Sequence, residues 1–297
     1  MSDPAKQCTF VCMKRRAFTH LQKITLGRFT LAWTPVWAVL LLLGATRPLM
    51  AQPTLAAVAA FNAYTATVES RLAGQHRSPG TFLATTPLDS GADTMRLRKG
   101  EPIIEQLTPA TGAEFSGSLL HHWRGTAFVP GAKASDFERL MQDFKDYPQH
   151  FSPQVLEARV IAQSGDRMQA SMRVRQQHVI PVVMDTTYDI TYGRLDTQHG
   201  YSNSRSTRIA EIYAAGTSAE RALNADEEHG FLWRLNTYWS YEERDGGLYL
   251  QIEAVSLTRS IPHGLGWAIR PYIESIPRDS LEFTLRSTCN ALRRKTA

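Results

Sequence analysis

Two side chains of this sequence, His122 and Glu253, are candidates for moving a proton at a bound ligand. A general acid or base must lie within hydrogen-bond reach of the atom that it serves. His121 and His122 are neighbours on an expected strand, so they point to opposite faces of the sheet and cannot hold one metal ion together. We therefore expect at most one of them, His122, to face a cavity. The alternative is a histidine that is satisfied in the core or lies on the surface.

Charged side chains on the expected strands could orient a carboxylate or hydroxyl group of a ligand. They are Arg205, Arg208, Glu211, Arg234 and Glu253. Arg205 and Arg208 fall on opposite faces of one strand, so only one can point inward, and we take Arg208 as the candidate. A structural network of ion pairs is the alternative, because buried charges are costly unless they are paired.

Large aromatic side chains could line a pocket for an apolar ligand. They are Trp123, Tyr188, Tyr192, Trp233 and Trp239. Ordinary packing of the core explains them equally well. The ligand-binding set that we expect is His122, Tyr188, Tyr192, Arg208, Trp233, Trp239 and Glu253.

Motifs for metals, nucleotides and nucleophilic catalysis are missing from the sequence. It has no HExxH, CxxC or His-x-His pattern, no Gly-x-Ser-x-Gly elbow and no Walker A loop. Gly264-Leu-Gly266 lacks the third glycine and the βαβ frame of a dinucleotide loop, so a turn explains it better. We expect no cofactor, no metal and no catalytic set.

The first 51 residues have the layout of an export signal. Basic residues precede a stretch from Arg28 to Arg47 that contains no other charge, which is typical of a secretory signal peptide. Cleavage after Ala51 is expected; an uncleaved anchor is the alternative, since about 18 apolar residues is the lower limit for a span. Arg15 and Arg16 leave twin-arginine export open. The protein is expected to be periplasmic or attached to the outer side of the inner membrane.

The leader also accounts for the basic character of the chain, whose formal net charge is +5. Up to Gln52 it holds seven of the 33 basic and one of the 28 acidic residues, which leaves 26 and 27 for the body. A near-neutral body gives no argument for nucleic-acid binding. Cys289 is the only cysteine after residue 52, so the body cannot form an internal disulfide.

Residues 52–117 are expected to form an N-terminal extension that packs on the main domain. Apolar residues at three- and four-residue spacing predict a helix over 54–73. Prolines and glycines then make 81–117 irregular, with short edge strands expected at 95–97 and 103–107.

Residues 118–297 are expected to form an α+β domain. A first strand precedes a helix that begins at a capping box of Ser135 and Glu138. A short helical piece broken at Pro271 and a longer helix from Pro277 close the chain. The strands are expected at 119–129, 155–162, 168–175, 182–192, 201–212, 231–243 and 248–259. Because strands do not alternate with helices, we expect an antiparallel sheet of about six or seven strands wrapped around the terminal helix.

Asp245-Gly246 predicts the register of the last hairpin. A two-residue turn places Trp239 opposite Ile252, and both then share a face with Trp233 that lines the core or a cavity. Tyr238 and Glu253 lie on the other face. A one-residue bulge would exchange these faces on one strand.

Five segments of this domain carry a resemblance to a known superfamily. They are LHHWRGTAFVPG at 120–131, SRSTRIAE at 204–211, GFLWRLNTYW at 230–239, SLTRSIPHGLGW at 256–267 and IPRDSLEFTL at 276–285. With them, residues 118–297 resemble the helix-grip fold of the START and polyketide-cyclase-like (SRPBCC) superfamily, in particular uncharacterised exported proteins from Acidobacteria. The resemblance implies a cavity between sheet and helix that holds lipids, polyketides or other apolar ligands.

Three functions are compatible with these observations. The first is an exported, noncatalytic protein that binds an apolar or lipid-like small molecule. The second is a cyclase or dehydratase in the same cavity, which needs Glu253 or His122 as acid or base. The third is a structural envelope protein without a ligand. A cavity too small for more than a few waters would exclude the first, and Glu253 or His122 inside an open pocket would favour the second.

Overall fold

The computed structural model describes residues 52–84, 88, 90–108, 113–115, 117–177, 181–260 and 266–296. The chain forms two units, Met1–Arg47 and Pro48–Ala297, and the second is described below. The expected leader with its cleavage site at Ala51 lies outside the described residues, as do Gly264 and Leu265. Within the described part, no helix combines the length and the apolarity needed to span a membrane.

The described residues of the body form helices, long strands and short strands. The helices are α2 (Leu55–Gln75), α4 (Gly91–Arg98), α5 (Ala134–Gln142), α6 (Tyr147–His150) and α7 (Gly266–Thr296), with 3₁₀ turns η1 (Pro79–Thr81) and η2 (Phe144–Asp146). The long strands are β3 (Ser118–Pro130), β4 (Val155–Ser164), β5 (Arg167–Gln177), β6 (Pro181–Arg194), β7 (His199–Tyr213), β9 (Arg234–Arg244) and β10 (Gly247–Arg259). The short strands are β1 (Ile103–Gln106), β2 (Ala113–Phe115) and β8 (Arg221–Ala222).

All strand pairs of the described sheet are antiparallel. The order is β1-β3-β10-β9-β7-β6-β5-β4, with β2 also paired to β3 and β8 to β7. The seven long strands are those that the sequence predicts, and α7 is the expected terminal helix, so the α+β helix-grip architecture is confirmed. The three short strands raise the number to ten; β1 is the expected edge strand at 103–107, whereas β2 and β8 pair over only two or three residues, which is too short to show a period of two.

The hairpin register is confirmed. Arg244 pairs with Gly247 and Trp239 with Ile252. Asp245 and Gly246 have φ values of 57° and 75°. Two positive φ values in succession are those of a type I′ turn, whose twist matches that of the flanking strands. The Asp-Gly pair therefore sets which side chains of β9 and β10 share a face.

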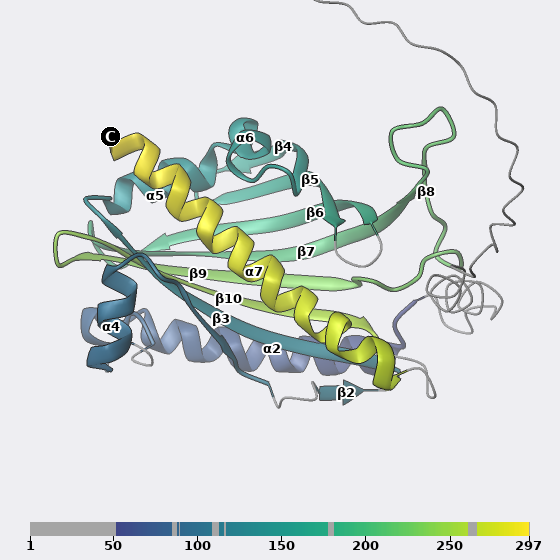
Figure 1. Cartoon of the computed structure of the whole chain (residues 1–297), viewed down its shortest axis with the longest axis horizontal. Coiled ribbons are helices and arrows are strands. Elements are labelled where there is room, and N and C mark those ends of the chain that lie inside the picture. The colour runs from purple at the N-terminus through teal and green to yellow at the C-terminus, as the bar shows by residue number, and fades with distance from the viewer. Residues whose placement is uncertain are drawn as a thin grey trace, which may run out of the picture. The chain divides into compact units, whose positions relative to one another are not determined.

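The central strands are covered on both sides. Figure 1 shows α7 crossing one face of the sheet while α2 lies along the opposite face. Leu250 and Ile252 of β10 pack with α7 in the inner core, whereas Val255 and Leu257 pack with α2 in the outer core. Because side chains alternate along a strand, one apolar strand supplies both cores. We call these sides the inner face, toward α7, and the outer face, toward α2.

Three local expectations are wrong. Residues 95–97 belong to α4 and form no strand, although the expected strand at 103–107 is present as β1. Helix α5 is capped at Lys133, whose N–H donates to the Asp136 carboxylate at 3.0 Å, two residues earlier than the expected Ser135 box. Helix α7 continues through Pro271 and Pro277. A proline has a helical φ, so the helix can continue with the loss of one backbone hydrogen bond at each.

Close approach of α7 to β3 generates the first prediction. Leu285 is fully buried, and a Cβ added to Gly125 would lie 2.9 Å from its Cδ2. Leu285→Ala should lower the free energy of unfolding by about 2–5 kcal/mol, because it leaves a cavity in the inner core. Urea denaturation measures this. The exposed neighbour Arg286 provides the control, and Arg286→Ala should change stability by less than about 0.5 kcal/mol. Equal effects would contradict the packing described here.

Candidate functional site

The inner face carries a cavity between the sheet and α7. Its volume is about 260 Å³. Three of the expected ligand-binding residues line it, Tyr188, Tyr192 and Trp239, and the second half of α7 adds Leu281 and Phe283. Met141 of α5, Phe144 of η2 and Tyr147 of α6 also line it. The aromatic set is therefore partly a cavity lining and partly core, as the two interpretations allowed.

The inner cavity is poor in charge. Arg175 is the one charged residue among its described lining residues. Burial raises the pKa of Tyr188 to about 12 and raises the pKa of Tyr192 further, so both phenols stay neutral. The Tyr192 hydroxyl donates to the Met141 carbonyl at 3.1 Å. No carboxylate or imidazole is among its described lining residues, although the buried His121 lies next to this lining, with its Nε2 3.4 Å from the Thr258 hydroxyl.

His122 and Glu253 meet on the outer face instead. They lie on the neighbouring strands β3 and β10, where Glu253 pairs with Arg124 and Val255 pairs with His122. His122 Nε2 lies 2.9 Å from Glu253 Oε2, and both side chains are buried. The sequence predicts Glu253 on this face but does not show that His122 joins it there.

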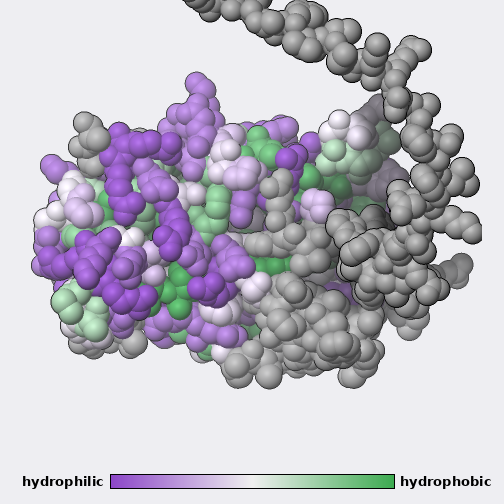
Figure 2. All heavy atoms as spheres, viewed as in Figure 1, coloured by the Kyte–Doolittle hydropathy of each residue, from purple (hydrophilic) through white to green (hydrophobic). Residues whose placement is uncertain are grey.

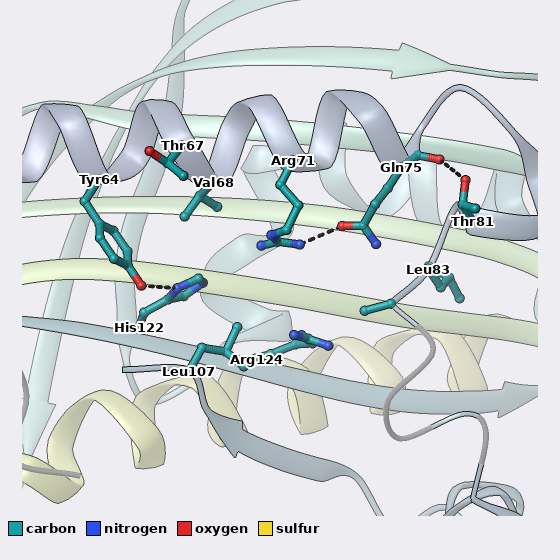
Figure 3. A pocket seen from close by; sticks show the side chains of 11 residues that line it. Tyr64, Thr67, Val68, Arg71, Gln75, Thr81, Leu83, Leu107, His122 and Arg124 are labelled. Carbon is teal, nitrogen blue, oxygen red and sulfur yellow. Dashed lines mark hydrogen bonds between the residues drawn. The ribbon is translucent and has the colours of Figure 1, made fainter. Parts of the chain in front are cut away.

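Three further residues complete the outer cluster. Arg71 of α2 donates to Glu253 Oε2 at 2.5 Å, and the Nε of Arg124 lies 3.3 Å from Glu253 Oε1. Tyr64, also of α2, has its hydroxyl 3.0 Å from His122 Nδ1. We call Tyr64, Arg71, His122, Arg124 and Glu253 the outer cluster. Figure 3 shows Tyr64 and Arg71 reaching down from α2 toward His122 and Arg124 on β3.

Hydrogen bonds and a neighbouring positive charge keep Glu253 ionised within the outer cluster. Burial by itself raises the pKa of Glu253, but the bond to His122 and the charge of Arg71 outweigh it and lower that pKa to about 2. A carboxylate is acceptor-only, so His122 donates from Nε2 to Glu253, and its Nδ1 shares a second hydrogen bond with the Tyr64 hydroxyl. Burial and the charge of Glu253 raise the pKa of Tyr64, which keeps its proton in place.

A cleft of about 690 Å³ opens above the outer cluster. It lies between α2, the segment from Thr81 to Ala84 and strand β3, as Figure 3 shows. Its lining combines polar groups with apolar walls: Tyr64, Thr67, Val68, Arg71, Gln75, Thr81, Leu83, Ala84, Leu107, His122 and Arg124. We call this space the outer cleft. Figure 2 shows the other side of the molecule, the one that α7 covers, where hydrophilic and hydrophobic residues are mixed on the described surface.

Two expected site residues lie away from both cavities. Arg208 is exposed, because a bulge puts Ser206 opposite Tyr188 but Arg208 opposite Thr187. The extra residue turns Arg208 to the face opposite that of Ser202 and Ser204. The placement of Arg208 in the cavity is therefore wrong.

The sequence-based placement of Trp233 in the inner cavity is also wrong. It precedes β9, so the alternation that orients Trp239 does not extend to it. Its side chain packs with Phe61 and Val68 of α2 in the outer core. Phe231 and Leu232 of the same segment line the inner cavity in its place.

Tyr64, Arg71 and Arg124 are missing from the sequence-based set. Tyr64 and Arg71 are seven residues apart on one helix, so they share a face two turns apart. This spacing indicates that the two side chains lie on the same face of the helix. It does not identify the residues that they contact, because these are known only once α2 is placed on the sheet. Arg124 is two residues from His122 on β3, and the same-face rule alone could have found it.

Asp143, Asp146 and His150 offer ligand atoms within 4.8 Å of one another. All three are partly exposed, and no second observation in the described residues points to an ion there. We assign no metal site to them.

The charge of Glu253 generates the second prediction. Its pKa of about 2 lies below the ordinary 4.5, so its contribution to stability is complete above pH 4.5 and is lost as pH falls toward 2. Glu253→Gln should be destabilised at pH 7, and its deficit should shrink by about 3 kcal/mol by pH 2. Denaturant titrations at several pH values measure this. Glu157→Gln, at an exposed glutamate of β4, is the control. A deficit that stays constant with pH would contradict the ionised cluster.

Comparisons with known proteins give structural neighbours only. No family model and no curated protein matches the chain. A STAR-related lipid transfer protein from Xanthomonas axonopodis has a TM-score of 0.41 and 15% identity, and covers 64% of this chain and 98% of its own. A START superfamily protein from Mycobacterium smegmatis has a TM-score of 0.40 and 14% identity, over 58% of this chain and 97% of its own. The Zhui aromatase/cyclase from Streptomyces sp. R1128 has a TM-score of 0.42 and 13% identity, over 60% of this chain and 96% of its own.

These TM-scores lie below 0.5, so the fold assignment rests on the element order and sheet topology of the chain itself. The resemblance to exported acidobacterial proteins stays a prediction. The described residues show a helix-grip architecture, with an apolar cavity on the inner face and a polar cleft on the outer face.

Proposed function

We propose that this protein is an exported binding protein that holds an apolar or lipid-like small molecule in the inner cavity. The observation that carries the proposal is the lining of that cavity, which is mainly aromatic and aliphatic, with a single charged residue among those described. Removing apolar surface from water is the main driving force for binding in such a space.

The size of the cavity supports a small ligand. A volume of about 260 Å³ corresponds to about nine waters at ~30 Å³ each. It lies just below the ~300–1,000 Å³ of usual ligand pockets, which favours a compact or slender molecule. The space exceeds the few waters that would have argued for a purely structural protein.

Hydroxyl groups on the sheet wall would orient a polar end of the ligand. They come from β7, β9 and β10 and are Ser202, Ser204, Thr237, Ser256 and Thr258. A few placed polar groups in an apolar pocket are the usual source of orientation and specificity. We therefore expect a ligand with one hydroxyl or carbonyl group on an apolar body.

An acid–base enzyme in this cavity is not favoured. The cyclase or dehydratase hypothesis needed His122 or Glu253 in the cavity, and both lie across the sheet in the outer cluster. The basic and then apolar leader supports export, and cleavage after Ala51 would decide between a periplasmic and a membrane-attached protein.

A cavity-filling variant tests the proposal. Ala254 lines the inner cavity, so Ala254→Phe should fill it and weaken binding of the neutral fluorescent probe N-phenyl-1-naphthylamine by at least about tenfold. Fluorescence titration measures this. Ala222→Phe adds the same ring at an exposed position of β8 and should leave the affinity unchanged.

Native mass spectrometry of protein purified from its own host provides the second measurement. It should detect an apolar molecule that Ala254→Phe lacks. Absence of any bound molecule, together with equal probe binding by both variants, would overturn the proposal.

A further inference from the structure

Polar side chains line the outer cleft, and they have no part in the proposed function. Two arginines and a histidine are among its lining residues, and no carboxylate is among those described. Glu253 lies beneath this lining, with its side chain 4% exposed. The positive groups therefore face the cleft, while their main counter-charge is buried behind them.

Arg71 has donors to spare. One terminal nitrogen donates to Glu253 at 2.5 Å and the other to Gln75 Oε1 at 2.6 Å. A guanidinium has five N–H donors, so two such bonds leave three. The side chain is 40% exposed, which makes these donors accessible from solvent.

The buried Glu253 carboxylate holds the guanidinium groups of Arg71 and Arg124 in place without a ligand. Glu253 contacts Arg71 and Arg124 from opposite oxygens, and His122 holds the carboxylate from a third direction. The Gln75 backbone carbonyl accepts from the Thr81 hydroxyl at 3.0 Å, which ties the end of α2 to the opposite wall of the cleft. A site of this kind loses little side-chain entropy on binding.

The nearby charges are balanced but unevenly placed. Glu105 is a second acid close to the cluster, 3.9 Å from Arg124, and it is not among the described lining residues of the cleft. The walls of the cleft include Val68, Leu83 and Leu107, which offer apolar surface beside the arginines. Planar guanidiniums match the geometry of carboxylates and phosphates, which they bind through paired hydrogen bonds.

We propose that the outer cleft binds a small organic anion, whose carboxylate or phosphate group pairs with Arg71 and Arg124 while its apolar part lies on the cleft walls. The site is separate from the inner cavity, since the sheet lies between them. It also requires α2, which supplies Arg71 and Tyr64, so the N-terminal extension is part of a binding site and not only a cover for the sheet.

Binding of defined probes tests this inference. Benzoate and phenyl phosphate carry the two candidate groups on the same ring, and benzyl alcohol is the uncharged comparison. We expect one of the two anions, but not benzyl alcohol, to shift the amide resonances of Gln75 and His122 in NMR titrations. The preferred anion identifies the head group. Arg71→Met should weaken its binding by at least about tenfold, because a charged hydrogen bond is lost.

Two control variants, Arg98→Met and Ala254→Phe, and one further test variant, Thr67→Trp, separate anion binding in the outer cleft from effects on folding and on the inner cavity. Arg98→Met removes an exposed arginine that pairs with Asp245 elsewhere, and it should leave anion binding unchanged. Thr67→Trp, at an exposed position of the lining, should block the cleft while all charges remain. Ala254→Phe should have no effect. Absence of anion-specific shifts, or unchanged binding in Thr67→Trp, would overturn the inference.

Discussion

Strands β3, β9 and β10 are buried on both faces, and the rest of the structure follows from that burial. Each of these strands supplies apolar side chains to two cores at once, and the polar side chains buried between them need hydrogen-bonding partners. Helix α7 completes one core and helix α2 the other. Without α2, Val255 and Leu257 would face water. The N-terminal extension is therefore an integral layer of the fold.

The same burial separates two kinds of chemistry. The inner face keeps hydroxyls and aromatic rings around an apolar space, whereas the outer face gathers an ionised carboxylate and two guanidiniums. An ion is costly in an apolar interior unless it is paired and hydrogen-bonded. Glu253 meets that requirement through residues of a strand neighbour and of α2, so its charge remains on the side of the sheet where partners exist.

Much of the fold could be predicted because its signals are local. Asp245-Gly246 specifies a turn whose register determines the faces of β9 and β10, and the seven long strands each carry a period of two. The inner lining by Tyr188, Tyr192 and Trp239 follows from this alternation. Residues whose position depends on distant partners could not be found in this way. Arg71 acquires a role only when α2 docks on β10, 182 residues away in sequence.

Irregular backbone accounts for the remaining differences. Trp233 lies just before a strand, where alternation does not hold, and Arg208 follows a bulge that no composition signal marks. Helix α7 passes two prolines because each disturbs only its own hydrogen bond. These are positions where a single backbone torsion, and not the side-chain pattern, decides the outcome.

The bulge in β7 has a consequence for how this protein can change over time. The one inserted residue between Ser206 and Arg208 turns the Arg208 side chain away from the inner cavity. Point substitutions along β7 alter one contact each, but a one-residue deletion there would reverse the sidedness of every position beyond it. The length of this strand is therefore under tighter restraint than its composition, and natural variants should tolerate replacements in β7 far better than gaps.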